Sequence, residues 1–225
     1  MTPDTTKPLV HHLIILDESG SMSSVREQTI RAFNELMAKN DSLVAEYPDQ
    51  EHRLTFVTFN TAGIRTVCFD IPLNEPIRLS PETYVPDHST PLWDAMGSSV
   101  LKVKHHIYGH PDHKVLVTVI TDGMENASRE FSGKEIKMMI EGLREKNWVF
   151  TYLGADHDVD SVADGIGIHS GNRLNWDKNR PQHSWESIHQ MRTHFATRLR
   201  GKEKLEEDLM KKALEEMESD KNKNG

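Results

Sequence analysis

Residues 114–121 constrain the fold more than any other part of this sequence. They read KVLVTVIT, a nearly continuous run of apolar and β-branched residues. Such a run is typical of a central strand that is buried on both faces of a parallel sheet. Parallel strands are joined by crossover connections, which are usually helices. The chain should therefore contain further apolar runs, separated by segments with helical periodicity.

The rest of the chain has this alternation. Short apolar or alternating runs predict strands at residues 10–16, 53–60, 64–71 and 148–153, with a further short strand near 168–174. The second and third of these flank the turn Asn60-Thr61-Ala62-Gly63, which is typical of a hairpin. Strands that alternate with helices predict an α/β fold, with a mostly parallel sheet, helices on both faces and one antiparallel strand from the hairpin.

Start signals place the helices between these strands. Ser24 with Glu27, and Ser132 with Glu135, have the spacing of a capping box. Thr90 followed by Pro91 predicts a helix that runs to about residue 106, with Thr90 as its N-cap. A short helix is expected from about residue 158. A last core helix is expected from the apolar residues Trp185, Ile188, Met191, Phe195 and Leu199.

The predicted boundaries are a flexible leader at residues 1–8, one domain at 9–200 and a charged tail at 201–225. In the tail, apolar residues recur every fourth position at Leu205, Leu209, Ala213 and Met217 among many Lys and Glu. Such a stripe can pack on a partner helix, but it spans fewer than three heptads and is marginal for a coiled coil. We expect a solvated helix or a frayed tail.

Composition excludes several classes of protein. The single cysteine, Cys68, forms neither a disulfide framework nor a cysteine-based zinc site. The apolar runs are far shorter than the roughly 18 residues of a membrane span, and the first residues lack the apolar stretch of a signal peptide. We therefore expect a cytoplasmic protein. The net charge of −8 argues against binding to nucleic acid or to an anionic membrane.

Oxygen-bearing side chains follow the predicted strands at one edge of the sheet. The turn Asp17-Glu18-Ser19-Gly20-Ser21 comes directly after the first strand, and Asp122-Gly123 comes directly after residues 114–121. In such sheets, ligands bind outside the carboxyl ends of the strands. Carboxylates and hydroxyls are hard donors that suit Mg²⁺, with Mn²⁺ or Ca²⁺ as alternatives, and disfavour zinc.

The pattern Asp17-x-Ser19-x-Ser21, together with Thr90 and Asp122-Gly123, resembles the metal-ion-dependent adhesion site (MIDAS) of von Willebrand factor type A domains. The similarity covers roughly residues 9–170 and extends to the helix that ends near 200. The words LDESGSM, TPLWDAM and TDGMENAS look like those of intracellular bacterial or phage members. This resemblance implies a Rossmann-like, doubly wound sheet with one antiparallel edge strand.

The resemblance also implies a function. Ser19, Ser21 and Thr90 would bind a divalent cation directly, whereas Asp17 and Asp122 would bind it through water. The last coordination position would accept an Asp or Glu from a protein partner. Intracellular relatives often act beside ring-forming ATPases, so an ATPase-containing complex is one expected partner. The chain is thus expected to be a non-catalytic, cation-dependent protein-binding module.

Four residues near this edge are expected to form a partner-binding rim: Glu18, Asn126, Asp156 and Asp158. Glu18 either tunes the field around the cation or is an exposed turn residue, and the latter is favoured. Asn126 and Ser128 either hydrogen-bond the metal loop or are ordinary loop residues. The acids at 156, 158 and 160 do not form an EF-hand, because Ser161 stands at the required glycine and Gly167 at the bidentate glutamate.

Two other functions compete with this interpretation. A metal-dependent phosphoryl-transfer enzyme would use Asp17 as nucleophile, but Ser19 stands where such enzymes need a second acid. An assembly scaffold would act through the C-terminal helix. The histidines at 105, 106, 110 and 113 have spacing that permits a transition metal. The strand order places them at the opposite edge, where a solvated connection is expected.

Overall fold

A single mixed sheet organises the computed structural model, which describes residues 7–110, 112–155, 158–176, 181–203 and 208–223. Its strands are β1 (Leu9–Asp17), β2 (Glu51–Asn60), β3 (Gly63–Pro72), β4 (His113–Thr121), β5 (Trp148–Gly154) and β6 (Arg173–Asn175). The spatial order is β3-β2-β1-β4-β5-β6. Every neighbouring pair is parallel except β2 and β3, so the antiparallel hairpin strand lies at the edge. The predicted fold class is confirmed.

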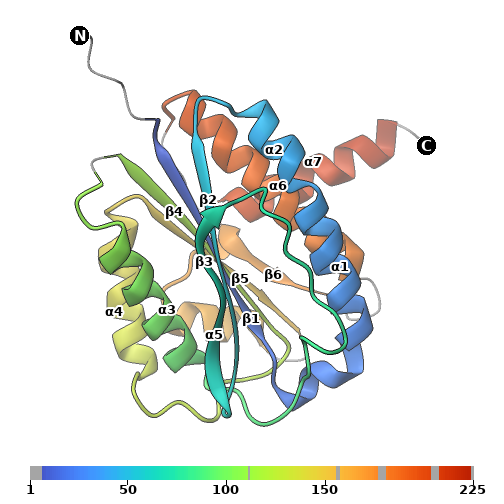
Figure 1. The fold of residues 1–225 in the computed structure, drawn as a ribbon, viewed down its shortest axis with the longest axis vertical. Helices are drawn as coiled ribbons and strands as arrows, with labels where there is room; N and C mark the ends of the chain where they lie inside the picture. Colours follow the sequence, from blue (N-terminus) through green and yellow to red (C-terminus); the bar gives the residue numbers. More distant parts are fainter. Residues whose placement is uncertain (1–6, 111, 156–157, 177–180, 204–207, 224–225) are drawn as a thin grey trace.

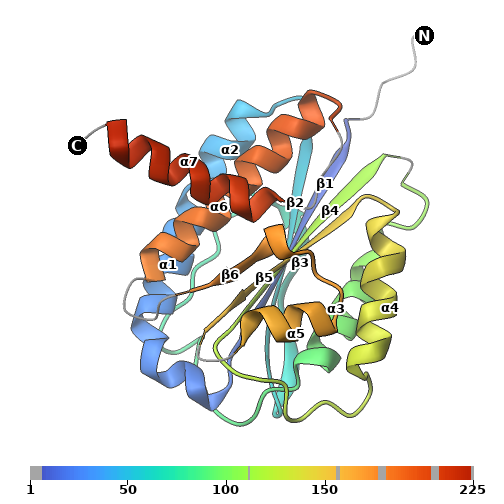
Figure 2. The same ribbon diagram turned by 180° about the vertical axis from the view of Figure 1, so that it is seen from behind.

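Helices cover both faces of the sheet (Figures 1 and 2). One layer contains α1 (Arg26–Ala38), α2 (Asn40–Glu46), α6 (Pro181–Arg200) and α7 (Leu209–Lys223). The other contains α3 (Leu92–His106), α4 (Gly133–Arg144) and α5 (Val159–Gly165). Short 3₁₀ helices at Gly20–Val25 and Ser170–Asn172 complete the described elements. The chain is therefore a three-layer sandwich with two separate apolar cores.

The central strand β4 contributes to both cores, as its composition predicts. Leu116 and Ile120 pack in the core under α1 and α6, whereas Val117 and Val119 pack under α3 and α4. Alternate residues of a strand point to opposite faces of the sheet, so a strand between two helical layers must be apolar throughout. No described helix has the length and apolar character needed to cross a membrane.

Two helix starts differ from the sequence prediction. The Ser24–Glu27 capping box is absent, because residues Gly20–Val25 form a 3₁₀ helix and α1 begins only at Arg26. The Ser24 hydroxyl donates instead to the carbonyl of Ser21, at 3.2 Å. At α3 the N-cap is Pro91 rather than Thr90.

The predicted capping box at α4 is present and gives a direct stability test. The Ser132 hydroxyl accepts from the Glu135 amide, and the Glu135 carboxylate accepts from the Ser132 amide. Ser132→Ala should lower the free energy of unfolding by about 1 kcal/mol, measured by urea denaturation. Ser24→Ala is the matched control, because that hydroxyl caps no helix. An equal loss in both variants would contradict this assignment.

The C-terminal helix is not the solvated or frayed tail that we expected. Leu209, Met210 and Ala213 are fully buried and belong to the same core as the apolar face of α6. The Leu209 amide also donates to the Asn172 side chain, at 2.9 Å. The periodic stripe thus packs within the chain, with α7 lying against α6 (Figure 2). Leu205 lies outside the described residues.

Candidate metal centre

Asp17 ends β1 in a fully buried position, beside the end of β4. Its Oδ1 accepts from the Ser19 amide at 2.7 Å, and its Oδ2 accepts from the Thr121 hydroxyl at 2.5 Å. Burial, with a smaller contribution from the charge of Asp122, raises the pKa of this carboxyl to about 6 in spite of these hydrogen bonds. The carboxylate is therefore held in one orientation in a site that already carries another negative charge.

Ser21 connects the first turn to the loop that follows β4. Its hydroxyl donates to Asp122 Oδ1 at 2.5 Å and lies 3.1 Å from the Ser19 hydroxyl. Since the Ser21 proton is directed to a carboxylate, Ser21 Oγ accepts the Ser19 proton and keeps one lone pair for another partner. Two acids and two hydroxyls from separate segments of the chain thus form one continuous cluster.

Thr90 reaches the same cluster from the start of α3. Its amide donates to the side chain of Asn126 at 2.9 Å, and its carbonyl accepts from the Asn126 amide at 3.2 Å. These paired bonds tie the Thr90 backbone to the loop after β4, which explains why Thr90 is not the N-cap of α3. Asn126 therefore bonds one of the predicted ligands. The Ser128 hydroxyl does not reach the metal turn, because it accepts from the Asp94 amide and donates to Glu125.

Gly123 shows where these oxygens converge. A Cβ atom built on this glycine would lie 3.2 Å from Thr90 Oγ1, 3.3 Å from Ser21 Oγ and 3.9 Å from Asp17 Oδ2. A carboxylate and two hydroxyls thus converge beside Gly123, which is the donor chemistry of a hard divalent cation. The five predicted ligands lie together, and these residues fit such an ion.

Hydroxyl groups supply three of the five predicted ligands. The described part of the chain contains no group of three or more His, Cys, Asp or Glu arranged to hold a metal. The predicted ligands are carboxylates and hydroxyls, which are hard oxygen donors.

The rim residues prove to have local partners. Glu18 is only 8% exposed and pairs with Arg65, so it is not the exposed turn residue that we expected. Asn126 holds Thr90, and Asp158 caps α5 by accepting from the Ser161 amide at 3.0 Å. Asp156 lies outside the described residues. A partner-binding role for these residues stays a prediction.

Two carboxylates that support the site were not predicted from the sequence. Asp94 is more than the acidic first-turn residue of α3, because its carboxylate accepts three backbone N–H groups from residues 129–131. Glu125 accepts from the amides of Trp93, Ala127 and Ser128. Together these carboxylates fasten the loop after β4 to α3. The only signal in the sequence is the acidic, Ser- and Asn-rich composition of that loop.

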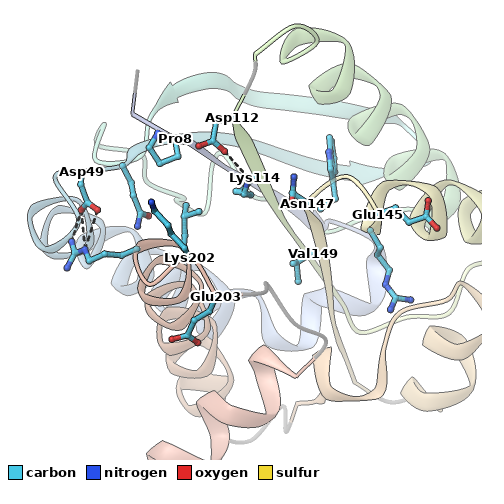
Figure 3. Close-up of a pocket in the computed structure, with 14 residues that line it drawn as sticks. Pro8, Asp49, Asp112, Lys114, Glu145, Asn147, Val149, Lys202 and Glu203 are labelled. Atoms are coloured by element: carbon cyan, nitrogen blue, oxygen red, sulfur yellow. Dashed lines mark hydrogen bonds and ion pairs between the residues drawn. The ribbon is translucent and has the colours of Figure 1, made fainter. Parts of the chain in front are cut away.

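The opposite edge of the sheet is chemically different. A cavity of about 830 Å³ opens there beside the starts of β4 and β5, where Lys114 and Asn147 line it (Figure 3). None of the five predicted ligands lines this cavity. Two of the histidines expected at this edge have local partners, since His106 bonds Asp70 at 2.7 Å and His113 bonds the carbonyl of His110.

Comparison with known proteins supports the fold. No protein-family model and no curated protein matches the sequence. Among solved structures, the chain is similar to proximal thread matrix protein 1 from the mussel byssus, with a TM-score of 0.56 and 14% identity over 83% of this chain and 46% of that one. A second crystal form of that protein gives a TM-score of 0.52 and 13% identity over 81% of this chain and 45% of that one.

A third structure of the same mussel protein, with a zinc-occupied MIDAS motif, gives a TM-score of 0.53 and 12% identity over 81% of this chain and 45% of that one. This chain therefore spans slightly less than half the length of these neighbours. At such low identity the likeness shows the fold alone, which is of the von Willebrand factor type A kind. The zinc belongs to the mussel protein.

Proposed function

We propose that this chain is a non-catalytic protein-binding module that depends on a divalent cation. In this proposal Asp17, Ser19, Ser21, Thr90 and Asp122 hold Mg²⁺ or Mn²⁺, with Ca²⁺ as an alternative. The observation that carries it is the convergence of Thr90 Oγ1, Ser21 Oγ and Asp17 Oδ2 around Gly123. The mussel neighbour with a metal-occupied MIDAS motif supports a metal-dependent interaction module in general.

The charges of the site explain why a partner carboxylate would bind. Two acids and three neutral hydroxyls supply at most two negative charges, one of them on the buried Asp17. A divalent cation in this set would keep Lewis acidity for one further oxygen ligand from outside. Burial raises the pKa of Tyr84, and the negative charges of Asp17, Glu18 and Asp122 contribute in the same direction. A cation would offset these charges.

Two features favour binding over phosphoryl transfer. Asp17 has no exposed surface, and both of its oxygens accept hydrogen bonds from the chain. A nucleophile needs an oxygen that can reach the substrate. In addition, Ser19 holds the position of the second acid. The scaffold hypothesis is weakened as well, because the apolar stripe of α7 is already covered by α6.

The finer assignments follow from the sequence motifs. We propose that the protein acts in the cytoplasm and belongs with the intracellular bacterial or phage type of this fold. Its partner would present an Asp or Glu, and an ATPase-containing complex is one candidate. Nucleic acid and membranes are not expected partners, given the net charge of −8.

Calorimetric titration of the purified chain with Mg²⁺, Mn²⁺, Ca²⁺ and Zn²⁺ tests this function. We expect saturable binding of Mg²⁺ or Mn²⁺, weakened at least about tenfold in Ser21→Ala because one direct ligand is lost. In a pull-down with Mg²⁺ present, the wild-type chain should retain its protein partners and Ser21→Ala should lose them. Ser24→Ala is the control, because Ser24 lies in the same 3₁₀ helix as Ser21 but outside the cluster.

Three results would contradict the proposal. Partner binding that is unchanged in Ser21→Ala and in chelator would exclude recognition through the metal. If the wild-type chain had phosphatase activity and Asp17→Asn abolished it, the phosphoryl-transfer enzyme would be favoured. Binding of Zn²⁺ alone would contradict the choice of cation.

A further inference from the structure

The segment that carries Thr90 to the site has no regular structure of its own. Residues 73–90 lie between β3 and α3 and contain neither a helix nor a strand. Segments of this length are usually variable in conformation, and ordering them costs conformational entropy. Yet Thr90 is only 3% exposed and lies beside Ser21 and Asp17. Other residues must therefore fix the path of this segment.

Glu18 makes the contacts that fix it. Its side chain accepts from the Val85 amide at 2.8 Å and pairs with Arg65 Nη2 at 3.0 Å. The same Arg65 nitrogen donates to the carbonyl of Thr83 at 2.7 Å. The Glu18 carbonyl accepts from the Asp87 amide at 3.0 Å. Glu18 thus holds the segment at Val85 and Asp87, and its partner Arg65 holds it at Thr83.

Neighbouring residues extend this attachment on both sides. The buried Tyr84 donates its phenolic proton to the carbonyl of Asp17 at 2.6 Å. The Gly20 amide donates to the carbonyl of His88 at 2.9 Å. Residues 83–88 therefore run along the turn that contains Asp17, Ser19 and Ser21, and Thr90 follows two residues later. The attachment of this segment and the position of Thr90 are geometrically linked.

We propose that Glu18 and Arg65, with the backbone of residues 83–87, form a latch that positions Thr90 Oγ1 for cation binding. Glu18 is a positioning residue, since its side chain is directed to Arg65 and Val85. The inference rests on the proposed function, because it assigns a role in preparing the same site. Neither Glu18 nor Arg65 is a ligand in the MIDAS pattern.

The charge of Arg65 also matters for the site. Glu18 is buried between Asp17 and Ser19, and a buried carboxylate without a cationic partner is strongly destabilising. Arg65 neutralises it, so the negative charge facing the cation stays that of Asp17 and Asp122. The half-exposed Arg65 side chain thus both secures the segment and compensates Glu18.

A double-mutant cycle on Mg²⁺ or Mn²⁺ affinity tests the latch. Glu18→Gln keeps an acceptor for the Val85 amide but removes the charge pair, and we expect it to weaken binding about tenfold. Arg65→Met should act in the same direction. Arg200→Met is the matched control, because Arg200 pairs with Asp49 at a similar exposure but at the opposite edge. In a Thr90→Val background, Glu18→Gln should add less than about twofold.

Hydrogen exchange gives a second measurement that needs no metal. In metal-free protein, the Val85 and Asp87 amides should exchange at least about tenfold faster in Glu18→Gln and Arg65→Met than in the wild type or Arg200→Met. Circular dichroism confirms that each variant is folded.

The outcomes distinguish a failure of the latch proposal from a failure of the proposed function. Weaker binding that is not additive with Thr90→Val, together with faster exchange, supports the latch. Additive effects, or unchanged exchange at Val85 and Asp87, would overturn it while leaving the metal site intact. A wild-type chain that binds no divalent cation would overturn the proposed function and, with it, the role of the latch.

Discussion

Gly123→Ala is expected to lower the affinity for Mg²⁺ or Mn²⁺ on the order of 100-fold while the fold persists. The added methyl would lie 3.2 Å from Thr90 Oγ1 and 3.3 Å from Ser21 Oγ, closer than ordinary van der Waals contact. It would occupy the space on which the proposed ligands converge, so that a cation could not reach all of them. Calorimetric titration measures the loss.

A second glycine provides the control. A Cβ at Gly142, in α4, would meet nothing within 4 Å. Gly142→Ala should therefore leave cation affinity unchanged and stabilise the helix by up to about 1 kcal/mol. If Gly123→Ala bound the cation as tightly as Gly142→Ala, the space beside Gly123 would not be the cation site. Thermal melting in chelator shows whether either change disturbs the fold itself.

The sequence predicts those features that depend on local periodicity and strand order. The β-branched run of β4 and the alternating residues around Asn60 and Gly63 indicate the central strand and the antiparallel hairpin, and both are confirmed. The edge at which Asp17 and Asp122 meet follows from parallel strand order alone. Their actual side-chain contacts, through Thr121 and Ser21, need the folded register.

Features that depend on irregular backbone were not predictable in this way. The segment with Tyr84 and Val85 has no period, so nothing in the sequence shows that it runs along the metal turn. Glu18 reads as an exposed turn residue because its partner Arg65 is 47 positions away, on β3. The tail was misjudged for a related reason. Apolar residues at every fourth position show that α7 has an apolar face, but they do not show that α6 covers this face.

The sheet also buries histidines whose protonation the fold opposes. His11 and His52 are fully or almost fully buried, and burial lowers the pKa of each to about 4. Burial likewise lowers the pKa of His12, which stacks on His52. The nearby Arg192 is only 1% exposed, and its charge lowers the pKa of both His12 and His52 further. Protonated imidazoles here would add positive charge to a core that already holds a guanidinium.

Acidification should consequently destabilise the protein between about pH 6.5 and pH 4. Unfolded histidine has a pKa near 6.5, so in this range the unfolded chain binds more protons than the folded one, and stability falls as the pH falls. At pH 5 the loss relative to pH 7 is about 2 kcal/mol for each of His11 and His52. Asp17 acts in the opposite direction, because its folded pKa of about 6 exceeds the unfolded value.

Urea denaturation at pH 7 and pH 5 measures the net effect. We expect a loss of at least about 3 kcal/mol, which is the contribution of His11 and His52 less that of Asp17. His12 acts in the same direction as the other two histidines and increases the loss. Asp17→Asn removes that contribution and should enlarge the loss by about 1 kcal/mol. His52→Phe preserves an aromatic ring against His12 and should reduce the loss by about 2 kcal/mol, whereas His105→Gln, at an exposed position of α3, is the matched control. Equal losses in His52→Phe and the wild type would show that buried histidines do not set the acid sensitivity of this fold.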